Sequence, residues 1–308
     1  MKKLKQKVII ICGPTASGKT DLSINIAEKI NGEIVSADSM QIYKDMDIGT
    51  AKPSMEERKK IEHYMIDIIN PDERYSVADF KCEAMKCIEK IVKKGKVPIV
   101  VGGTGLYIDS IYYGIEYNEI KTDLVYREKL EEIAKKEGLE KLYEKALEID
   151  PIAIKKISKN DKKRIIRVLE IYHETGKTKT EQEAESIKKE KPYDYKIFAI
   201  DMDRKQLYER INKRVDMMID QGLIEEVEKI LKKYNTFPTA MQGLGYKEVV
   251  KYINNEYTKE EMIEKIKMES RRYAKRQITW FKRNKDIIWL NSSDKEKQMM
   301  EVLSKWMK

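Results

Sequence analysis

Residues 13–20, GPTASGKT, combine the residue types and the spacing that bind phosphate groups in proteins. They match the pattern G-x-x-x-x-G-K-T, and the apolar run VIIIC (8–12) precedes them as a strand. The two glycines allow backbone conformations that turn N–H groups toward an anion, and the helix behind them adds positive potential. Lysine supplies a charge for the phosphates, and the threonine hydroxyl is a ligand for Mg²⁺. The sequence therefore predicts a phosphate site formed by Gly13, Pro14, Thr15, Ala16, Ser17, Gly18, Lys19 and Thr20, with Thr20 as the Mg²⁺ ligand.

Asp38 is a candidate for chemistry next to this site. A nucleotide hydrolase or kinase places an acidic residue for metal and water, usually at the end of an apolar strand. The apolar segment VPIVV (97–101) ends in Gly-Gly-Thr instead, whereas EIVS (33–36) leads into Asp38. Aspartate often forms turns after strands, but ligands also bind at this edge of open α/β sheets. Asp38 could thus serve a substrate rather than a metal; neither His63 nor His173 is assigned to catalysis.

An alternation of strands and helices must position these residues. Continuous apolar runs are interpreted as buried strands, and the segments between them have the apolar spacing of helices. Ser76 and Asp79 form a capping box that begins a helix extending to about Lys94. Such an alternation predicts a parallel sheet with helices on both faces. The expected strands are 8–12, 33–36, 65–69 and 97–101, and 38–54 is expected to be a long loop.

The second part of the chain differs in its pattern. Between residues 123 and 189 only helical spacing is present, and the strand-like segment YKIFAID (195–201) follows. We predict an α/β fold: a parallel sheet core like that of P-loop NTPases, with helices on both faces and an inserted all-helical domain. The predicted bounds are 1–115 with 192–308 for the core and its C-terminal helices, and 116–191 for the insertion.

The net charge and composition of the chain indicate what kind of molecule it could bind. The 308 residues include 62 Lys or Arg and 53 Asp or Glu, a formal net charge of +9. This excess suits a polyanion such as nucleic acid, and it equally suits a chain that is simply rich in lysine. Basic residues concentrate in 155–167 and recur at helical spacing at Arg272, Arg276 and Arg283, around Trp280. Three cysteines without a C-x-x-C pair predict neither a disulfide framework nor a zinc site. No segment has the length of a membrane span, and a cytoplasmic protein is expected.

Six motifs, taken together, resemble those of one enzyme family, the bacterial tRNA dimethylallyltransferases, also called tRNA isopentenyltransferases. The motifs occur in the family's order and span nearly the whole chain, and the second is far more specific than the phosphate loop. They are GPTASGKT (13–20), SADSMQIYKDMDIGTAKP (36–53), VGGTGLY (101–107), NDKKRIIRVLEIYHETGKT (160–178), LGYKE (244–248) and AKRQITWFKRN (274–284).

This resemblance implies the reaction. A dimethylallyl group would move from dimethylallyl diphosphate to N6 of adenine 37, next to the anticodon of a tRNA, and diphosphate would leave. The phosphate loop would hold the donor diphosphate with Mg²⁺ and with Arg214, which occupies the place of the family's diphosphate-binding arginine. Asp38 would be the general base, and Thr104 would contact the substrate. The implied partners are tRNA and dimethylallyl diphosphate, and a monomer is expected.

The resemblance also implies that the insertion, 116–191, binds tRNA, and it implies a set of tRNA contacts. A stacked base cannot reach such a pocket, so the adenine would be flipped out and held by a large basic surface with aromatic side chains. The implied tRNA-binding residues are Asp38, Ser39, Met40, Gln41, Thr104, Tyr126, Arg127, Lys163, Arg164, Ile165, Ile166, Arg167, Gln242, Gly243, Leu244, Gly245, Tyr246, Lys247, Lys275, Arg276, Gln277, Trp280 and Lys282.

Three other functions remain open on the sequence. A P-loop kinase or NTPase would split ATP, which labelled ATP tested against labelled dimethylallyl diphosphate with unmodified tRNA would reveal. An adenylate isopentenyltransferase would act on free nucleotides and would have no use for the two basic clusters. An RNA-binding module without activity would leave the phosphate loop unexplained.

Overall fold

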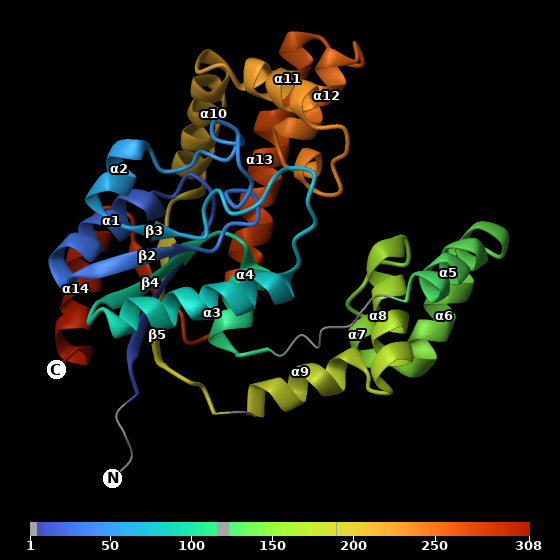
Figure 1. Cartoon of the computed structure of the whole chain (residues 1–308), viewed down its shortest axis with the longest axis horizontal. Coiled ribbons are helices and arrows are strands. Elements are labelled where there is room, and N and C mark those ends of the chain that lie inside the picture. The colour runs from blue at the N-terminus through green and yellow to red at the C-terminus, as the bar shows by residue number, and fades with distance from the viewer. Residues whose placement is uncertain (1–4, 116–122, 189) are drawn as a thin grey trace. The chain divides into compact units, whose positions relative to one another are not determined.

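The computed structural model describes residues 5–115, 123–188 and 190–308. Contacts divide the chain into two compact units. The core unit comprises Met1–Tyr112 and Pro192–Lys308, and the helical unit comprises Tyr113–Lys191 (Figure 1). Each unit is described by itself.

A six-stranded sheet forms the centre of the core unit. All its strand pairs are parallel, and the strand order is β3-β2-β4-β1-β5-β6. The middle strands are buried over nearly their whole length, as in sheets covered on both faces. The predicted α/β fold is thereby confirmed. The strands are β1 (Lys7–Cys12), β2 (Gly32–Ser36), β3 (His63–Tyr64), β4 (Val97–Gly102), β5 (Asp194–Asp201) and β6 (Ile288–Asn291).

The third strand ends earlier in the chain than the sequence predicted. The expectation of a strand over 65–69 is wrong, because β3 ends at residue 64. Met65 and Asp67 have φ values of 64° and 56°, in the left-handed region, so the chain does not stay extended. The segment then donates backbone hydrogen bonds to the carbonyl of Ile42. Its apolar residues therefore continue toward the long loop after β2 and not along the sheet.

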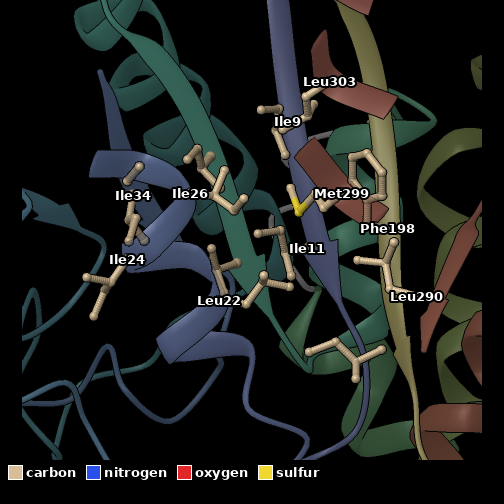
Figure 2. Packing of buried hydrophobic residues seen from close by; sticks show 14 of the residues in the cluster. Ile9, Ile11, Leu22, Ile24, Ile26, Ile34, Phe198, Leu290, Met299 and Leu303 are labelled. Atoms are coloured by element: carbon tan, nitrogen blue, oxygen red, sulfur yellow. The ribbon is translucent and has the colours of Figure 1, made fainter. Parts of the chain in front are cut away.

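Helices cover both faces of the sheet. Figure 2 shows Leu22 and Met299, from two different helices, packed with Ile11 of β1 on one face. Side chains alternate along a strand, so the neighbouring residues of β1 point to the opposite face, where α3 and α4 contact β4. The predicted capping box is confirmed, because Ser76 accepts the N–H of Asp79 and Asp79 accepts that of Ser76. The covering helices are α1 (Lys19–Ile30), α3 (Val77–Lys93), α4 (Gly105–Tyr112) and α14 (Lys295–Trp306).

A second helical layer of the core unit holds the long loop that follows β2. The loop side chains Ile42, Tyr43 and Met46 are buried among Val215 and Val249, which lie on two of these helices. The loop is therefore fixed by a small core of its own. This layer comprises α10 (Arg204–Asp220), α11 (Leu223–Lys233), the 3₁₀ turn η1 (Ala240–Gln242), α12 (Tyr246–Ile253) and α13 (Lys259–Phe281). The short helix α2 (Met55–Lys60) follows the long loop and has no buried residue.

The helical unit has its own hydrophobic core, formed around Leu130, Leu142 and Leu169. Its helices are α5 (Leu124–Lys136), α6 (Leu139–Ile149), α7 (Pro151–Ile154), α8 (Lys162–Thr175) and α9 (Lys179–Lys188), and its described residues contain no strand. Across both units, none of the described helices is both long enough and apolar enough to cross a membrane.

Candidate active site

Strand register brings three motifs to one edge of the sheet. Cys12 of β1 pairs with Gly102 of β4, and Ser36 of β2 pairs with Val101 of β4. The residues that follow these strands are therefore neighbours, although they are far apart in sequence. Gly102 is required here, because an added Cβ would lie 2.1 Å from the carbonyl oxygen of Ala37. The phosphate loop, the Asp38 segment and the Thr104 turn thus share one site.

The phosphate loop is closed by its own polar groups. Gly18 caps α1 in the left-handed conformation, with φ of 83°. The carbonyl of Pro14 accepts hydrogen bonds from Ser17 Oγ at 2.9 Å and from Lys19 Nζ at 2.7 Å. The Lys19 ammonium is therefore folded across the loop, while its side chain lines the cavity in front of it.

Arg214 brings a second cation to the loop from α10. Its Nη1 lies 3.4 Å from Thr15 Oγ1, to which it donates. Burial lowers the pKa of Lys19 to about 8, with the nearby Arg214 charge as the next cause and Asp38 opposing both. Burial also lowers the pKa of Arg214. Two cations that disfavour each other in a confined space form a site suited to an anion.

Asp38 has one carboxylate oxygen bound and one available. Oδ1 accepts the N–H groups of Met40 at 2.9 Å and Gln41 at 3.4 Å, which fixes the side chain in a local turn. Oδ2 takes no hydrogen bond from the described residues, and Asp38 lines the cavity. Thr104 lies alongside, where its hydroxyl accepts the N–H of Ser39 at 3.0 Å. Thr104 thereby holds the turn that carries Asp38.

Two cavities share a wall at Asp38. The smaller, of about 100 Å³, is mainly polar and includes Lys19 and His63 in its lining. The larger, of about 310 Å³, is more apolar and includes Met218 and Leu244. A ligand with a charged end and an apolar or aromatic end fits this arrangement. The residues that line both cavities are Thr15, Asp38, Thr50, Arg214 and Tyr273.

Side chains of helix α13 hydrogen-bond to the phosphate loop and to the turn after β4. Gln277 accepts the N–H of Thr15 at 2.9 Å and donates to the carbonyl of Gly103 at 2.9 Å. Trp280 donates to the carboxylate of Asp109 at 2.8 Å. The polar groups of both side chains, which sequence reasoning assigned to tRNA binding, are thus engaged within the protein. The other predicted contacts of this helix region, Lys275, Arg276 and Lys282, are exposed.

The segment 242–247 lines the larger cavity, as do Ser39 and Met40, so the structure brings these predicted contacts to one place. Tyr246 is buried and donates to Glu226 Oε1 at 2.7 Å. Glu226 also accepts the backbone N–H groups of residues 47, 48 and 49, at 2.7 to 3.1 Å. This buried carboxylate joins the long loop to the cavity wall. The amide of Gln41 is used within the same loop, where it binds the carbonyls of residues 50 and 51.

The remaining predicted contacts lie in the helical unit. Lys163 and Arg164 are exposed on α8, whereas Ile165 and Ile166 are buried in the core of that unit. The Tyr126 ring stacks on His173, with 3.7 Å between centroids. Arg127 and Arg167 are half-buried beside the same helices.

Sequence reasoning missed three residues of the site in the core unit. Tyr273 lines both cavities, and burial together with the Asp38 charge raises its pKa to about 12. Its spacing of four from Gln277 places both on one helix face, which is a signal the sequence contains. His63 lines the smaller cavity, with its Nδ1 2.7 Å from the Ile61 carbonyl, and burial lowers its pKa. No local pattern marks His63, or Glu226.

The parallel sheet, with a glycine-bearing loop between its central strand and the helix that follows, places the core unit among the P-loop α/β proteins. Within that class, a model of the family described as IPP transferase matches residues 41–284. The chain belongs to this family, the tRNA dimethylallyltransferases, which confirms the resemblance found in the six motifs.

Individual relatives extend over nearly the whole chain. A tRNA dimethylallyltransferase of Acetivibrio thermocellus is 51% identical over 288 residues, 93% of this chain and 92% of its own length. The crystal structure of the full-length tRNA isopentenylpyrophosphate transferase of Bacillus halodurans superposes with a TM-score of 0.72 at 40% identity, covering 97% of this chain and 94% of that one. A eukaryotic dimethylallyltransferase acting on tRNA gives a TM-score of 0.76 at 32% identity, over 93% of this chain and 74% of that chain.

Proposed function

We propose that the protein transfers a dimethylallyl group from dimethylallyl diphosphate to N6 of adenine 37, next to the anticodon of tRNAs, with release of diphosphate. One observation carries the proposal. Asp38, with a free carboxylate oxygen, lies at the wall shared by a cationic cavity and a larger, more apolar cavity. That juxtaposition suits a prenyl diphosphate on one side and a nucleobase on the other, and the named activities of the relatives support it.

The phosphate loop would bind the leaving group. An allylic C–O bond breaks readily when the charge that develops on the departing oxygens is neutralised. Thr15, Lys19 and Arg214 line the space in which those oxygens would lie, and the other loop N–H groups are proposed to turn toward them. Burial disfavours both charges, as the lowered pKa values of Lys19 and Arg214 indicate, and a bound diphosphate would favour them.

The donor set also fits Mg²⁺. Thr20 lines the smaller cavity, and its hydroxyl has no hydrogen-bond partner among the described residues. Those residues contain no cluster of three or more His, Cys, Asp or Glu that could hold a metal alone. Mg²⁺ would accordingly be shared between Thr20, diphosphate oxygens and water, as this ion prefers. When bound, it would supply further neutralisation of the leaving group.

Asp38 would accept a proton from N6. The amine is a poor nucleophile because its lone pair is delocalised into the ring, and proton removal as the bond forms assists attack. Oδ1 is held by two backbone N–H groups, which leaves Oδ2 as the atom that takes the proton. Thr104 and Ser39 fix this turn and are proposed to contact the adenine as well.

The tRNA would be held around the mouth of the site and by the helical unit. In the core unit, the exposed cations are Lys275, Arg276 and Lys282, and the segment 242–247 forms the cavity wall. In the helical unit, Lys163 and Arg164 are exposed. These cations would contact phosphates, which position the RNA, while the cavity would read the extruded base. We also propose that the protein acts as a monomer.

Mass spectrometry tests the proposal. Unmodified tRNA, dimethylallyl diphosphate, Mg²⁺ and the protein are incubated, and digested nucleosides are examined for one added five-carbon unit on adenine 37. In a fixed time, Asp38→Asn should lower the yield of product by at least about 10²-fold, whereas Asp45→Asn, on the same loop but paired with Lys233, should not. Splitting of ATP without any prenylated nucleoside would refute the proposed function.

A further inference from the structure

A buried carboxylate lies between two arginines of the helical unit. Glu170, on α8, has a side chain that is 1% exposed. Its Oε1 lies 3.1 Å from Nε of Arg127, on α5, and its Oε2 lies 3.3 Å from Nη1 of Arg167, one turn earlier on α8. The carboxylate therefore joins guanidinium groups from two different helices.

A buried charge of this kind requires compensation, because removing a carboxylate from water is unfavourable unless a cation pairs with it. One cation would balance the charge, but Glu170 contacts two. Arg127 and Arg167 remain 36% and 42% exposed, so each guanidinium presents donors to solvent that Glu170 does not use. The arrangement leaves a net positive charge and keeps both guanidinium groups beside one buried carboxylate, Arg167 by a hydrogen bond to Oε2 and Arg127 by an ion pair with Oε1.

We propose that Glu170 is a positioning residue for tRNA binding, which orients Arg127 and Arg167 so that their free N–H groups meet phosphate oxygens. The inference rests on the proposed function, since it requires that this face of the helical unit bind tRNA. An arginine fork matches phosphate well only when its plane is held, and a free side chain loses rotamer entropy on binding. Glu170 would remove that loss before the RNA arrives.

The proposal and an argument from net charge alone predict opposite effects of replacing Glu170 on the affinity for RNA. Replacing an acid by a neutral residue in a basic surface should tighten RNA binding if only net charge matters. If Glu170 acts through the arginines, Glu170→Gln should weaken binding, because an amide oxygen can accept from one guanidinium while its NH₂ group repels the other. Glu128→Gln is the matched control: it makes the same charge change on α5, where Glu128 is exposed and has no partner among the described residues.

The measurement is the Kd of the full-length protein for unmodified tRNA over a range of salt concentrations. For Glu170→Gln we expect about fivefold weaker binding and a slope of log Kd against log salt that falls by about 0.7 for each lost phosphate contact. Glu128→Gln should stay within about twofold of the wild type, with the same slope. A merely structural defect would lower the active fraction without changing the slope.

A double-mutant cycle shows whether Glu170 acts through the arginines. In the Arg127→Lys Arg167→Lys background, which keeps cations beside the buried carboxylate but removes the planar guanidinium groups, Glu170→Gln should change Kd by less than about twofold. If Glu170→Gln does not fold, Glu170→Asp replaces it: the charge is kept but drawn back by one methylene, and the same loss is expected.

Unchanged or tighter binding by both Glu170 variants, or an equal loss in the arginine-free background, would overturn the inference while leaving the proposed function intact. Absence of tRNA binding by the wild type would overturn both.

Discussion

Raising the pH past about 8 is expected to weaken the binding of dimethylallyl diphosphate through the loss of one proton from Lys19. In the empty site, burial and the Arg214 charge disfavour the ammonium form, which lowers the pKa of Lys19 to about 8. A bound diphosphate favours the ammonium form and raises that pKa again. Binding is therefore coupled to proton uptake that increases as the pH rises through about 8.

The magnitude follows from the pKa. With a value of about 8, roughly 0.9 of the molecules carry the ammonium at about pH 7 and roughly 0.1 at about pH 9. If only the protonated form binds well, the apparent Kd rises by about tenfold over this interval. An ordinary lysine would stay protonated throughout and would produce no change.

Isothermal titration calorimetry without tRNA measures both the apparent Kd for the donor and the number of protons taken up on binding. The donor is suitable because its own phosphate protons are lost by about pH 7, since phosphate esters have a second pKa near 6. Titrations in two buffers of different ionisation enthalpy should show uptake that approaches one proton per site at about pH 9. Lys29→Gln, which removes an exposed lysine at the other end of α1, should keep the profile. Lys19→Gln should bind weakly at every pH.

A Kd that stays constant between pH 7 and pH 9, with no proton uptake, would refute this account of Lys19. So would a Lys19→Gln variant that retains the wild-type dependence on pH, because another group would then be responsible.

Three further predictions concern the site and its support. Asp38→Asn should lower kcat by about 10²- to 10⁴-fold and change the Kd for tRNA little, because the variant loses proton removal but keeps the geometry of the site. Single-turnover kinetics measure the rate and filter binding measures the Kd. Near-normal turnover would contradict the general-base role. Glu226→Gln should lower the free energy of unfolding by about 1–3 kcal/mol, because three backbone N–H groups and the Tyr246 hydroxyl share this buried acceptor; an unchanged midpoint in urea would count against that view. Arg164→Ala should weaken tRNA binding and reduce the salt slope by about 0.7, and an unaltered slope would exclude a phosphate contact at Arg164.

Local features of this protein could be predicted from the sequence because they depend on neighbouring residues. The capping box at Ser76 forms as expected, since its hydrogen bonds join residues three apart. The phosphate loop follows a buried strand and begins a helix, and Gly18 takes the left-handed conformation that its residue type permits. The prediction of a strand over 65–69 was wrong, because an apolar run does not reveal that the backbone of Met65 and Asp67 leaves the extended region of φ and ψ.

The motifs together identified the family and the candidates Lys19 and Asp38, and the alternation of strand and helix patterns predicted the parallel α/β fold. Only the tertiary structure decided what surrounds them. Arg214 meets Thr15 across 199 positions of sequence, and Asp38 lies beside Thr104 because β2 and β4 pair in one register. Strand order, register and helix packing are set by contacts between distant segments, and the burial and charge that shift the pKa of Lys19 arise from those contacts. Sequence therefore specified the candidate groups for the chemistry, and packing specified their distances and their electrostatic surroundings.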